Sequence, residues 1–276
     1  MMNELIRLLG REKTTKEGIQ AWQKAQGPLT VTGLSGSIKA GFLCALQTFG
    51  KASDPLIILT PRREDVRLLR RELTPFYPDR AMRELYPIGL IHGEIDTRNE
   101  EVMAERAAAL EMILKKEAGI IFVTAEAAIQ KLPRPEGLMR DSMTLTQGDE
   151  KDRGELIERL VKEGYERTDQ VETLGQFSVR GDILDIFPIN AKDPIRIEWF
   201  DETIDAIRRF SLEDQRSIGA LIKVDIMPIA SGEKEAESSL FDYVSPDQLL
   251  VLDEAAAFFE EAKKSYLDNR EFKEQL

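Results

Sequence analysis

Apolar and polar positions follow two different patterns along this chain. In its first part, short unbroken apolar runs alternate with stretches in which apolar residues recur every three to four positions. The unbroken runs predict β-strands at Leu29–Gly33, Leu56–Thr60 and Gly119–Thr124, and the stretches Arg62–Phe76 and Arg98–Lys116 predict amphipathic helices. Unbroken apolar strands that alternate with helices are typical of a parallel sheet with helices packed on it. We therefore expect an α/β domain.

The pattern changes near Leu132. The segment Leu132–Gly137, LPRPEG, holds two prolines that interrupt the helical spacing and predict a linker. Beyond it, polar and apolar residues alternate over Asp182–Phe187 and Pro194–Phe200, with one clear helix at Arg153–Glu163. Closely spaced alternating strands with one helix predict a separate α+β domain.

The last part of the chain returns to the first pattern. A polar loop at Ala230–Ser239 leads to an unbroken apolar run at Leu249–Asp253 and a helix-forming run at Glu254–Leu267. The simplest arrangement returns this strand to the α/β domain and makes the α+β domain an insertion. The predicted division is residues 1–132, 133–229 and 230–276. The chain ends inside helix-forming sequence, so we expect a fragment of a larger protein.

The strand Pro194–Phe200 has an unusual outer face. Its inner parity is apolar: Ile195, Ile197 and Trp199. The other parity holds Arg196, Glu198 and Phe200, so a large aromatic stands on a face that ought to be polar. Arginine beside an exposed aromatic is the composition of an interface hot spot. The alternative is that Phe200 closes the strand end and Arg196 pairs with Glu198 or another neighbour.

Composition narrows the chemistry. The net charge is −12, so a nucleic-acid backbone is repelled on average and binding of DNA by this chain alone is disfavoured. The one cysteine, Cys44, excludes an internal disulfide, and its apolar neighbours suggest a buried residue in a reducing cytoplasm. With His92 as the only histidine, neither a thiol nucleophile nor a zinc site is expected. No apolar run approaches membrane-spanning length.

A phosphate-binding loop has lost two of its residues. GLSGSIKA lies between a predicted strand and a predicted helix, as a P-loop does, and keeps Gly33, Gly36 and Lys39. A working P-loop needs a glycine just before the lysine, for backbone approach to phosphate, and a Ser or Thr just after it, to bind Mg²⁺. Ile38 and Ala40 hold those places here. We therefore expect no nucleotide hydrolysis.

Three runs in the second part carry a family resemblance. VRGDILDIFP at Val179–Pro188 is followed by PIRIEWFDETIDAIRRF at Pro194–Phe210 and DQRS at Asp214–Ser217. This long combination resembles the second domain shared by UvrB and the transcription-repair coupling factor Mfd, the UvrB/Mfd family. The resemblance implies a degenerate P-loop, RecA/helicase-like parallel-sheet domain with an inserted α+β domain that interacts with UvrA.

The resemblance also implies site residues and partners. In that family UvrA contacts the arginine of the VRG motif, the arginine of the strand beyond IFP, and the aromatic four residues later; these positions are Arg180, Arg196 and Phe200. Arginine suits the role because its planar fork holds a carboxylate in two hydrogen bonds. We expect truncation of any of the three to weaken UvrA binding and hardly to affect folding. For the parent protein the resemblance implies other domains, RNA polymerase and DNA as partners. ATP and Mg²⁺ are implied only for its motor domains, with no cofactor for this segment.

Two further features bear on an ATPase or helicase role. Asp253 and Glu254 end the last apolar run and resemble the Walker B pair of UvrB, but they also suit the start of the following helix, where carboxylates complement the dipole. With the P-loop degenerate, we favour the capping role. The tyrosine-rich DNA hairpin of UvrB has no counterpart, because the segment in its place offers only Tyr77 and Tyr86. His92 in that segment is expected to be a surface or capping residue.

These observations predict a non-catalytic, cytoplasmic interaction module that recruits UvrA to stalled transcription complexes in nucleotide excision repair, without catalytic or metal-binding residues. One alternative is a UvrB-like helicase fragment that uses ATP on DNA, which an intact glycine before Lys39 would have favoured. Another is an autoinhibitory structural domain whose arginine and phenylalanine surface docks within the same protein. That second alternative is compatible with UvrA binding if the face is masked at rest.

Overall fold

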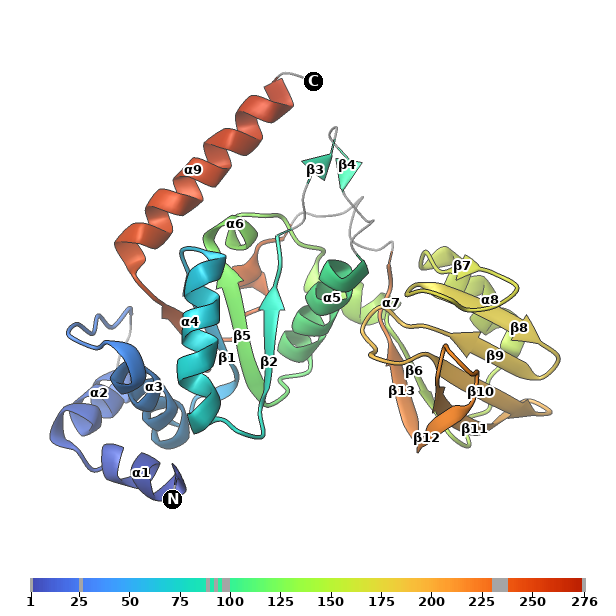
Figure 1. The fold of residues 1–276 in the computed structure, drawn as a ribbon, viewed down its shortest axis with the longest axis horizontal. Coiled ribbons are helices and arrows are strands. Elements are labelled where there is room, and N and C mark those ends of the chain that lie inside the picture. The colour runs from blue at the N-terminus through green and yellow to red at the C-terminus, as the bar shows by residue number, and fades with distance from the viewer. Residues whose placement is uncertain are drawn as a thin grey trace. The chain divides into compact units, whose positions relative to one another are not determined.

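The computed structural model describes residues 2–24, 27–87, 90–91, 94–95, 100–229 and 238–274. The chain folds into two compact units (Figure 1). The α/β unit comprises Met1–Pro87, Lys115–Gln130 and Val244–Leu276, and the α+β unit comprises Ile88–Leu114 and Lys131–Tyr243. Within the described ranges, no helix is both long and apolar enough to cross a membrane.

A four-stranded parallel sheet forms the core of the α/β unit. Its order is β14 (Gln248–Leu252), β1 (Ser53–Thr60), β5 (Gly119–Thr124) and β2 (Ala81–Leu85). The two central strands are buried almost throughout, as unbroken apolar runs require. The strands predicted at residues 56–60, 119–124 and 249–253 are therefore confirmed, and the last returns to the α/β sheet as expected.

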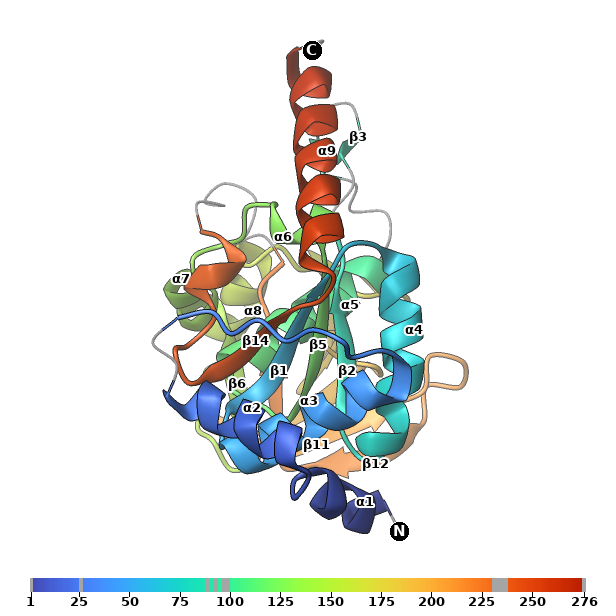
Figure 2. The same cartoon turned by 90° about the vertical axis from the view of Figure 1, so that its left-hand side faces the viewer.

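The helices of this unit pack on the sheet or on one another, and the C-terminal helix projects beyond the sheet (Figure 2). They are α1 (Met2–Leu9), α2 (Lys13–Lys24), α3 (Gly36–Gly50), α4 (Arg63–Leu73), α6 (Ala125–Ala128) and α9 (Ala255–Glu274), with a 3₁₀ turn at Thr74–Phe76. Leu43 of α3 and Val66 and Leu69 of α4 join the core formed by Leu56 and Phe122 of the sheet. The amphipathic pattern predicted for residues 62–76 thus buries one face, and that prediction is confirmed.

The strand predicted at Leu29–Gly33 is wrong. The segment pairs with none of the strands that the structure describes, and Leu29 and Val31 are exposed. Threonines alternate with its two large apolar side chains, so it cannot bury both faces as a central parallel strand does. β14 is consequently the outermost described strand on its side of the sheet. The degenerate loop, residues 33–40, follows irregular chain instead of a strand, and α3 begins within it at Gly36.

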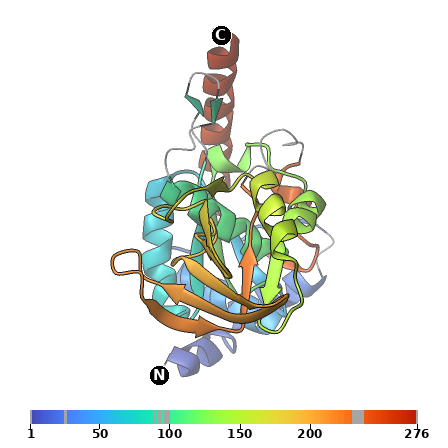
Figure 3. The ribbon, with the colours of Figure 1, turned by 90° about the vertical axis from the view of Figure 1, so that its right-hand side faces the viewer.

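The α+β unit is built on a six-stranded sheet (Figure 3). Its order is β12 (Ser217–Leu221), β11 (Thr203–Phe210), β10 (Ile195–Phe200), β9 (Ile183–Ile186), β8 (Gln176–Arg180) and β7 (Glu166–Arg167). All neighbours are antiparallel except β7 and β8. Two small sheets pair β13 (Lys223–Ile226) with β6 (Met143–Thr146), and β3 (Leu90–Ile91) with β4 (Glu94–Ile95). The helices are α5 (Glu100–Leu114), α7 (Pro135–Asp141) and α8 (Arg153–Lys162), with a 3₁₀ turn at Leu240–Asp242.

The inner face of this sheet is the predicted one. Ile195, Ile197 and Trp199 are buried, in a core shared with Leu156 and Leu160 of α8. The indole N–H of Trp199 donates to the carbonyl of Lys151 at 3.0 Å, so the buried ring leaves no unpaired donor. The strand parity that places Arg196 and Phe200 on the outer face is therefore confirmed.

Two parts of the α+β unit differ from expectation: the linker at its start and helix α5. The predicted linker at Leu132–Gly137 contains a helix start, because α7 begins at Pro135. Proline is well tolerated in the first helical turn, where its missing N–H would have had no helical partner. Helix α5, expected in the α/β domain, belongs to the α+β unit, where Glu111 accepts a hydrogen bond from Asn190 at 2.8 Å. An amphipathic pattern shows that a helix buries one face without showing against which unit.

Candidate functional site

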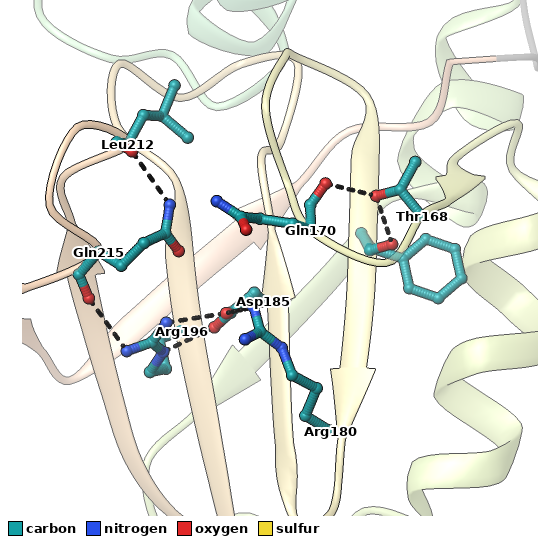
Figure 4. Close-up of polar contacts among 8 residues, drawn as sticks. Thr168, Gln170, Arg180, Asp185, Arg196, Leu212 and Gln215 are labelled. Atoms are coloured by element: carbon teal, nitrogen blue, oxygen red, sulfur yellow. Dashed lines mark hydrogen bonds and ion pairs between the residues drawn. The ribbon is translucent and has the colours of Figure 1, made fainter.

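Three adjacent strands bring Arg180, Asp185 and Arg196 to the outer face of the six-stranded sheet. Arg196 on β10 lies directly opposite Asp185 on β9, and Asp185 lies opposite Ser178 on β8. Arg180, two residues beyond Ser178, shares the parity of Ser178 and points to the same carboxylate. Figure 4 shows both guanidinium groups beside Asp185.

Arg196 is tied down from several sides. Its Nε and Nη2 donate to Oδ1 and Oδ2 of Asp185 at 2.7 and 2.9 Å, and its Nη1 donates to the carbonyl of Gln215 at 3.3 Å (Figure 4). The guanidinium carbon lies 4.8 Å from the ring centroid of the buried Phe210. Only 20% of the Arg196 side chain and 2% of the Asp185 side chain are exposed. A bidentate, largely buried pair of this kind is rigid because planar groups match in two hydrogen bonds.

The Arg180 side chain is exposed and more loosely paired than that of Arg196. Its Nη2 lies 3.7 Å from Oδ2 of Asp185, which is an ion pair beyond hydrogen-bond distance, and 56% of its side chain is exposed. One carboxylate thus faces two guanidinium groups. The cluster of Arg180, Asp185 and Arg196 carries a net charge of about +1 because both arginines stay protonated. Arg180 is the member with donors available to a partner.

Phe200 stands at the far end of β10. It is 78% exposed, the highest value among the large apolar side chains that the structure describes. A bulge between Glu198 and Trp199 precedes it, and Asp201 in the following turn has a positive φ of 59°. Four residues of strand separate Phe200 from Arg196, roughly 13 Å along the backbone. The arginine cluster and Phe200 are therefore two separate contact points on one face.

These contacts answer the alternatives for the outer face. Arg196 does pair with a neighbour, Asp185, while Glu198 accepts from Arg208 on β11. Phe200 ends its strand but does not pack there, so the high exposure expected of a hot-spot aromatic is present. Arg196 is nevertheless largely covered, because sequence parity shows which face a side chain takes without showing what covers it. The sequence reasoning missed Asp185; its signal was an acid within the predicted strand Asp182–Phe187, which precedes the strand that carries Arg196.

Lys39 of the degenerate loop lies beside the two acids that precede α9, Asp253 and Glu254. Nζ of Lys39 lies 2.6 Å from Oδ1 of Asp253 and 3.5 Å from Oε1 of Glu254. The Lys39 and Asp253 side chains are 18% and 11% exposed. Burial lowers the pKa of Lys39, but its hydrogen bond to Asp253 and the charges of both acids outweigh burial, so this pKa lies above its usual value. Asp253 and Glu254 thus both face Lys39, and the capping role favoured for the two acids stays a prediction.

The other loop positions surround this pair. Gly33 and Gly36 have positive φ values of 82° and 54°, which glycine adopts at low cost. The side chain of Ile38 is mostly exposed, whereas Ala40 is fully buried under the start of α3. The loop thus has two glycines with positive φ and exposes the apolar side chain of Ile38 at its surface.

The remaining candidate residues have structural surroundings. The hydroxyl of Tyr77 donates to Gln47 at 2.9 Å in the core, and the ring of Tyr86 lies 4.5 Å below the guanidinium of Arg63. Cys44 is buried as expected, and burial raises the pKa of its thiol. His92 lies outside the described residues.

Residues 143–231 match the family described as the UvrB interaction domain. The chain carries a UvrB interaction domain. The matched range runs from β6 past β13 and includes the whole outer face that presents Arg180, Asp185, Arg196 and Phe200. The architecture is the expected one: an α/β parallel-sheet unit combined with a UvrB interaction domain.

The UvrB interaction domain lies within a longer stretch of similarity. Over 200 residues, 72% of this chain, the sequence is 36% identical to the transcription-repair-coupling factor of Bacillus subtilis (strain 168). Over 202 residues, 73% of the chain, it is 32% identical to the protein of the same name from Staphylococcus aureus (strain USA300). Each matched stretch covers 17% of the relative. The chain is thus a UvrB-like region related to one segment of transcription-repair-coupling factors.

Proposed function

We propose that this chain is the UvrA-binding module of a transcription-repair coupling factor that acts in nucleotide excision repair. The observation that carries the proposal is the outer face of β8 to β10. It lies within the UvrB interaction domain and exposes Arg180 and Phe200 from a sheet whose opposite face is fully packed. A rigid strand that presents an aromatic and an arginine loses little conformational freedom on binding.

The two contact points suit different chemistry on the partner. Phe200 suits an apolar pocket, because its ring already stands in water and gains from burial. Arg180 suits a carboxylate, because the net positive charge of its cluster is not neutralised within the described part of the face. We infer an acidic, partly apolar UvrA surface as the complement.

We propose further that the α/β unit has no ATPase activity of its own. Three observations support this: Lys39 is paired with Asp253, Ile38 lies where the backbone would approach a phosphate, and Ala40 has no hydroxyl for Mg²⁺. A nucleotide would have to break the ion pair and would gain no metal ligand at position 40. The helicase alternative therefore has less support than an interaction module. RNA polymerase and DNA are proposed as partners only through the parent protein.

Calorimetry with purified UvrA tests the binding proposal. We expect Arg180→Ala and Phe200→Ala each to weaken binding roughly thirtyfold, equivalent to about 2 kcal/mol for a hot-spot side chain. Matched controls are Phe241→Ala, an exposed aromatic outside the matched range, and Arg71→Ala, an exposed arginine of α4. Both controls should bind as the wild type does. Unchanged affinity in both site variants would refute the assignment of this face.

A further inference from the structure

Asp185 is an unusual residue for the outer face of a sheet. Ser178 and Phe210 beside it are apolar or uncharged and also buried, whereas Asp185 is a carboxylate of which only 2% is exposed. Its two carboxylate oxygens receive Nε and Nη2 of Arg196, and Oδ2 also faces Arg180 at 3.7 Å. A buried carboxylate is costly unless it is fully paired, so its presence between the two arginines calls for a reason.

Asp185 acts on more than one strand. It holds the Arg196 guanidinium beside the ring of Phe210, 4.8 Å from the ring centroid, and Nη1 of Arg196 donates to the carbonyl of Gln215. Gln215 adopts a positive φ of 59° and donates from its side chain to the carbonyl of Leu212 at 3.1 Å (Figure 4). The contacts made by Asp185 and Arg196 therefore connect β9 and β10 to the loop that joins β11 and β12.

The same contacts change what Arg196 can offer a partner. Arg196 already uses Nε and Nη2 for Asp185 and Nη1 for the carbonyl of Gln215, and only 20% of its side chain is exposed, so it offers a partner fewer donors than Arg180 does. The available fork is that of Arg180, which Asp185 attracts without hydrogen-bonding it. Attraction at 3.7 Å restricts where this long side chain lies, and Asp185 takes none of its hydrogen-bond donors.

We propose that Asp185 is a positioning residue for UvrA recognition. It fixes Arg196 as a platform over Phe210 and holds the Arg180 guanidinium at the place where a UvrA carboxylate binds. This inference rests on the proposed function. An oriented Arg180 loses less rotamer freedom on binding than one that moves freely in solvent. Asp185 therefore strengthens binding of an acidic partner although it carries a negative charge.

The sign of the effect separates positioning from simple electrostatics. Asp185→Asn keeps the shape of the side chain and removes its charge. If Asp185 only reduced the positive charge of the face, this change would tighten binding of an acidic UvrA surface, most strongly at low salt. A positioning role requires weaker binding at both low and physiological salt, on the order of tenfold, as for lost supporting partners of other sites.

A double-mutant cycle measured by calorimetry completes the test. UvrA binding is measured for the wild type, Asp185→Asn, the pair Arg180→Ala with Arg196→Ala, and the triple variant, each at a temperature where circular dichroism shows it folded. The triple variant leaves no buried charge without a partner, so it remains measurable if Asp185→Asn alone unfolds. We expect the triple variant to bind UvrA as the arginine pair does, because Asp185 has nothing left to position.

The outcomes distinguish the two proposals. Wild-type chain that fails to bind UvrA refutes the proposed function and this inference with it. Wild-type binding together with unchanged or tighter binding by Asp185→Asn refutes the inference alone. A further loss in the triple variant relative to the arginine pair also refutes it, because Asp185 would then act independently of both arginines.

Discussion

Replacing Arg196 with alanine should destabilise the UvrB interaction domain, whereas replacing Arg180 should not. The sequence alone led us to expect that neither change would affect folding. The structure revises this for Arg196, because its loss leaves Asp185 buried, with Arg180 at 3.7 Å as the remaining cation among its described contacts. Arg180→Ala removes an exposed side chain and leaves the bidentate pair intact.

The expected size follows from burial. Removing one partner of a buried ion pair costs about 3 to 5 kcal/mol. Arg196 is 20% exposed and Arg180 remains nearby, which favours the lower limit, and the stacking on Phe210 adds to the loss. About 3 kcal/mol in a domain of this size corresponds to a fall in melting temperature of roughly 10 °C. For Arg180→Ala we expect a change within about 0.5 kcal/mol.

The chain offers a clean optical assay. Its two tryptophans lie in different units: Trp22 in α2 and Trp199 in β10. In a Trp22→Phe background, fluorescence reports unfolding of the UvrB interaction domain alone. Urea and thermal unfolding are then compared for Arg196→Ala, Arg180→Ala and their parent. Melting temperatures for the two arginine variants that agree within roughly 2 °C would refute the internal role assigned to Arg196.

Four further outcomes can be checked directly. Phe200→Ala should leave the melting temperature unchanged, because the ring is exposed; a clear fall in a thermal scan would show hidden packing. A fluorescent ATP analogue with Mg²⁺ should not bind, and micromolar binding that is lost in Lys39→Ala would contradict the proposed loss of nucleotide chemistry. A mobility-shift assay at physiological salt should retain little DNA, given the net charge of −12; a tight complex with a steep salt dependence would reveal an overlooked basic surface. Burial raises the pKa of Glu163 in the folded state, so ionisation opposes folding. Because the folded pKa is the higher one, Glu163 costs no stability below its unfolded pKa and destabilises the fold as pH rises through the folded pKa. In urea unfolding, Glu163→Gln should therefore be more stable than wild type at pH 7 and lose that advantage in acid. An advantage that persists in acid would argue against ionisation as the cause.

The sequence predicted the parts of the fold that depend on local patterns. Unbroken apolar runs located the central strands β1 and β5, and alternation located both faces of β10. It failed for Leu29–Gly33, because a short run of threonines and apolar residues has the composition of a strand whether or not a neighbouring strand pairs with it. It also failed to place α5, since amphipathicity does not identify the surface that a helix covers.

The candidate site was predicted in the same uneven way. Motif and parity identified Arg180, Arg196 and Phe200 as residues of one face, and the structure puts all three there. The low exposure of Arg196 could not be predicted, because it depends on Asp185 on the neighbouring strand and on Gln215, which lies nineteen positions after Arg196 in the sequence. Such contacts arise from strand register and loop geometry, which no single segment of sequence specifies.

The adjacency of Trp199 and Phe200 constrains how this surface can change over evolution. Consecutive residues of one strand supply the packed core and the exposed aromatic, so a shift of register by one residue would expose the indole and bury the phenyl ring. Insertions or deletions within β10 would therefore damage folding and recognition together. The face can diversify by exchange of outward side chains but cannot slide along the sheet. Specificity for a new partner would have to come from substitutions at fixed backbone positions, or from the loops at the strand ends.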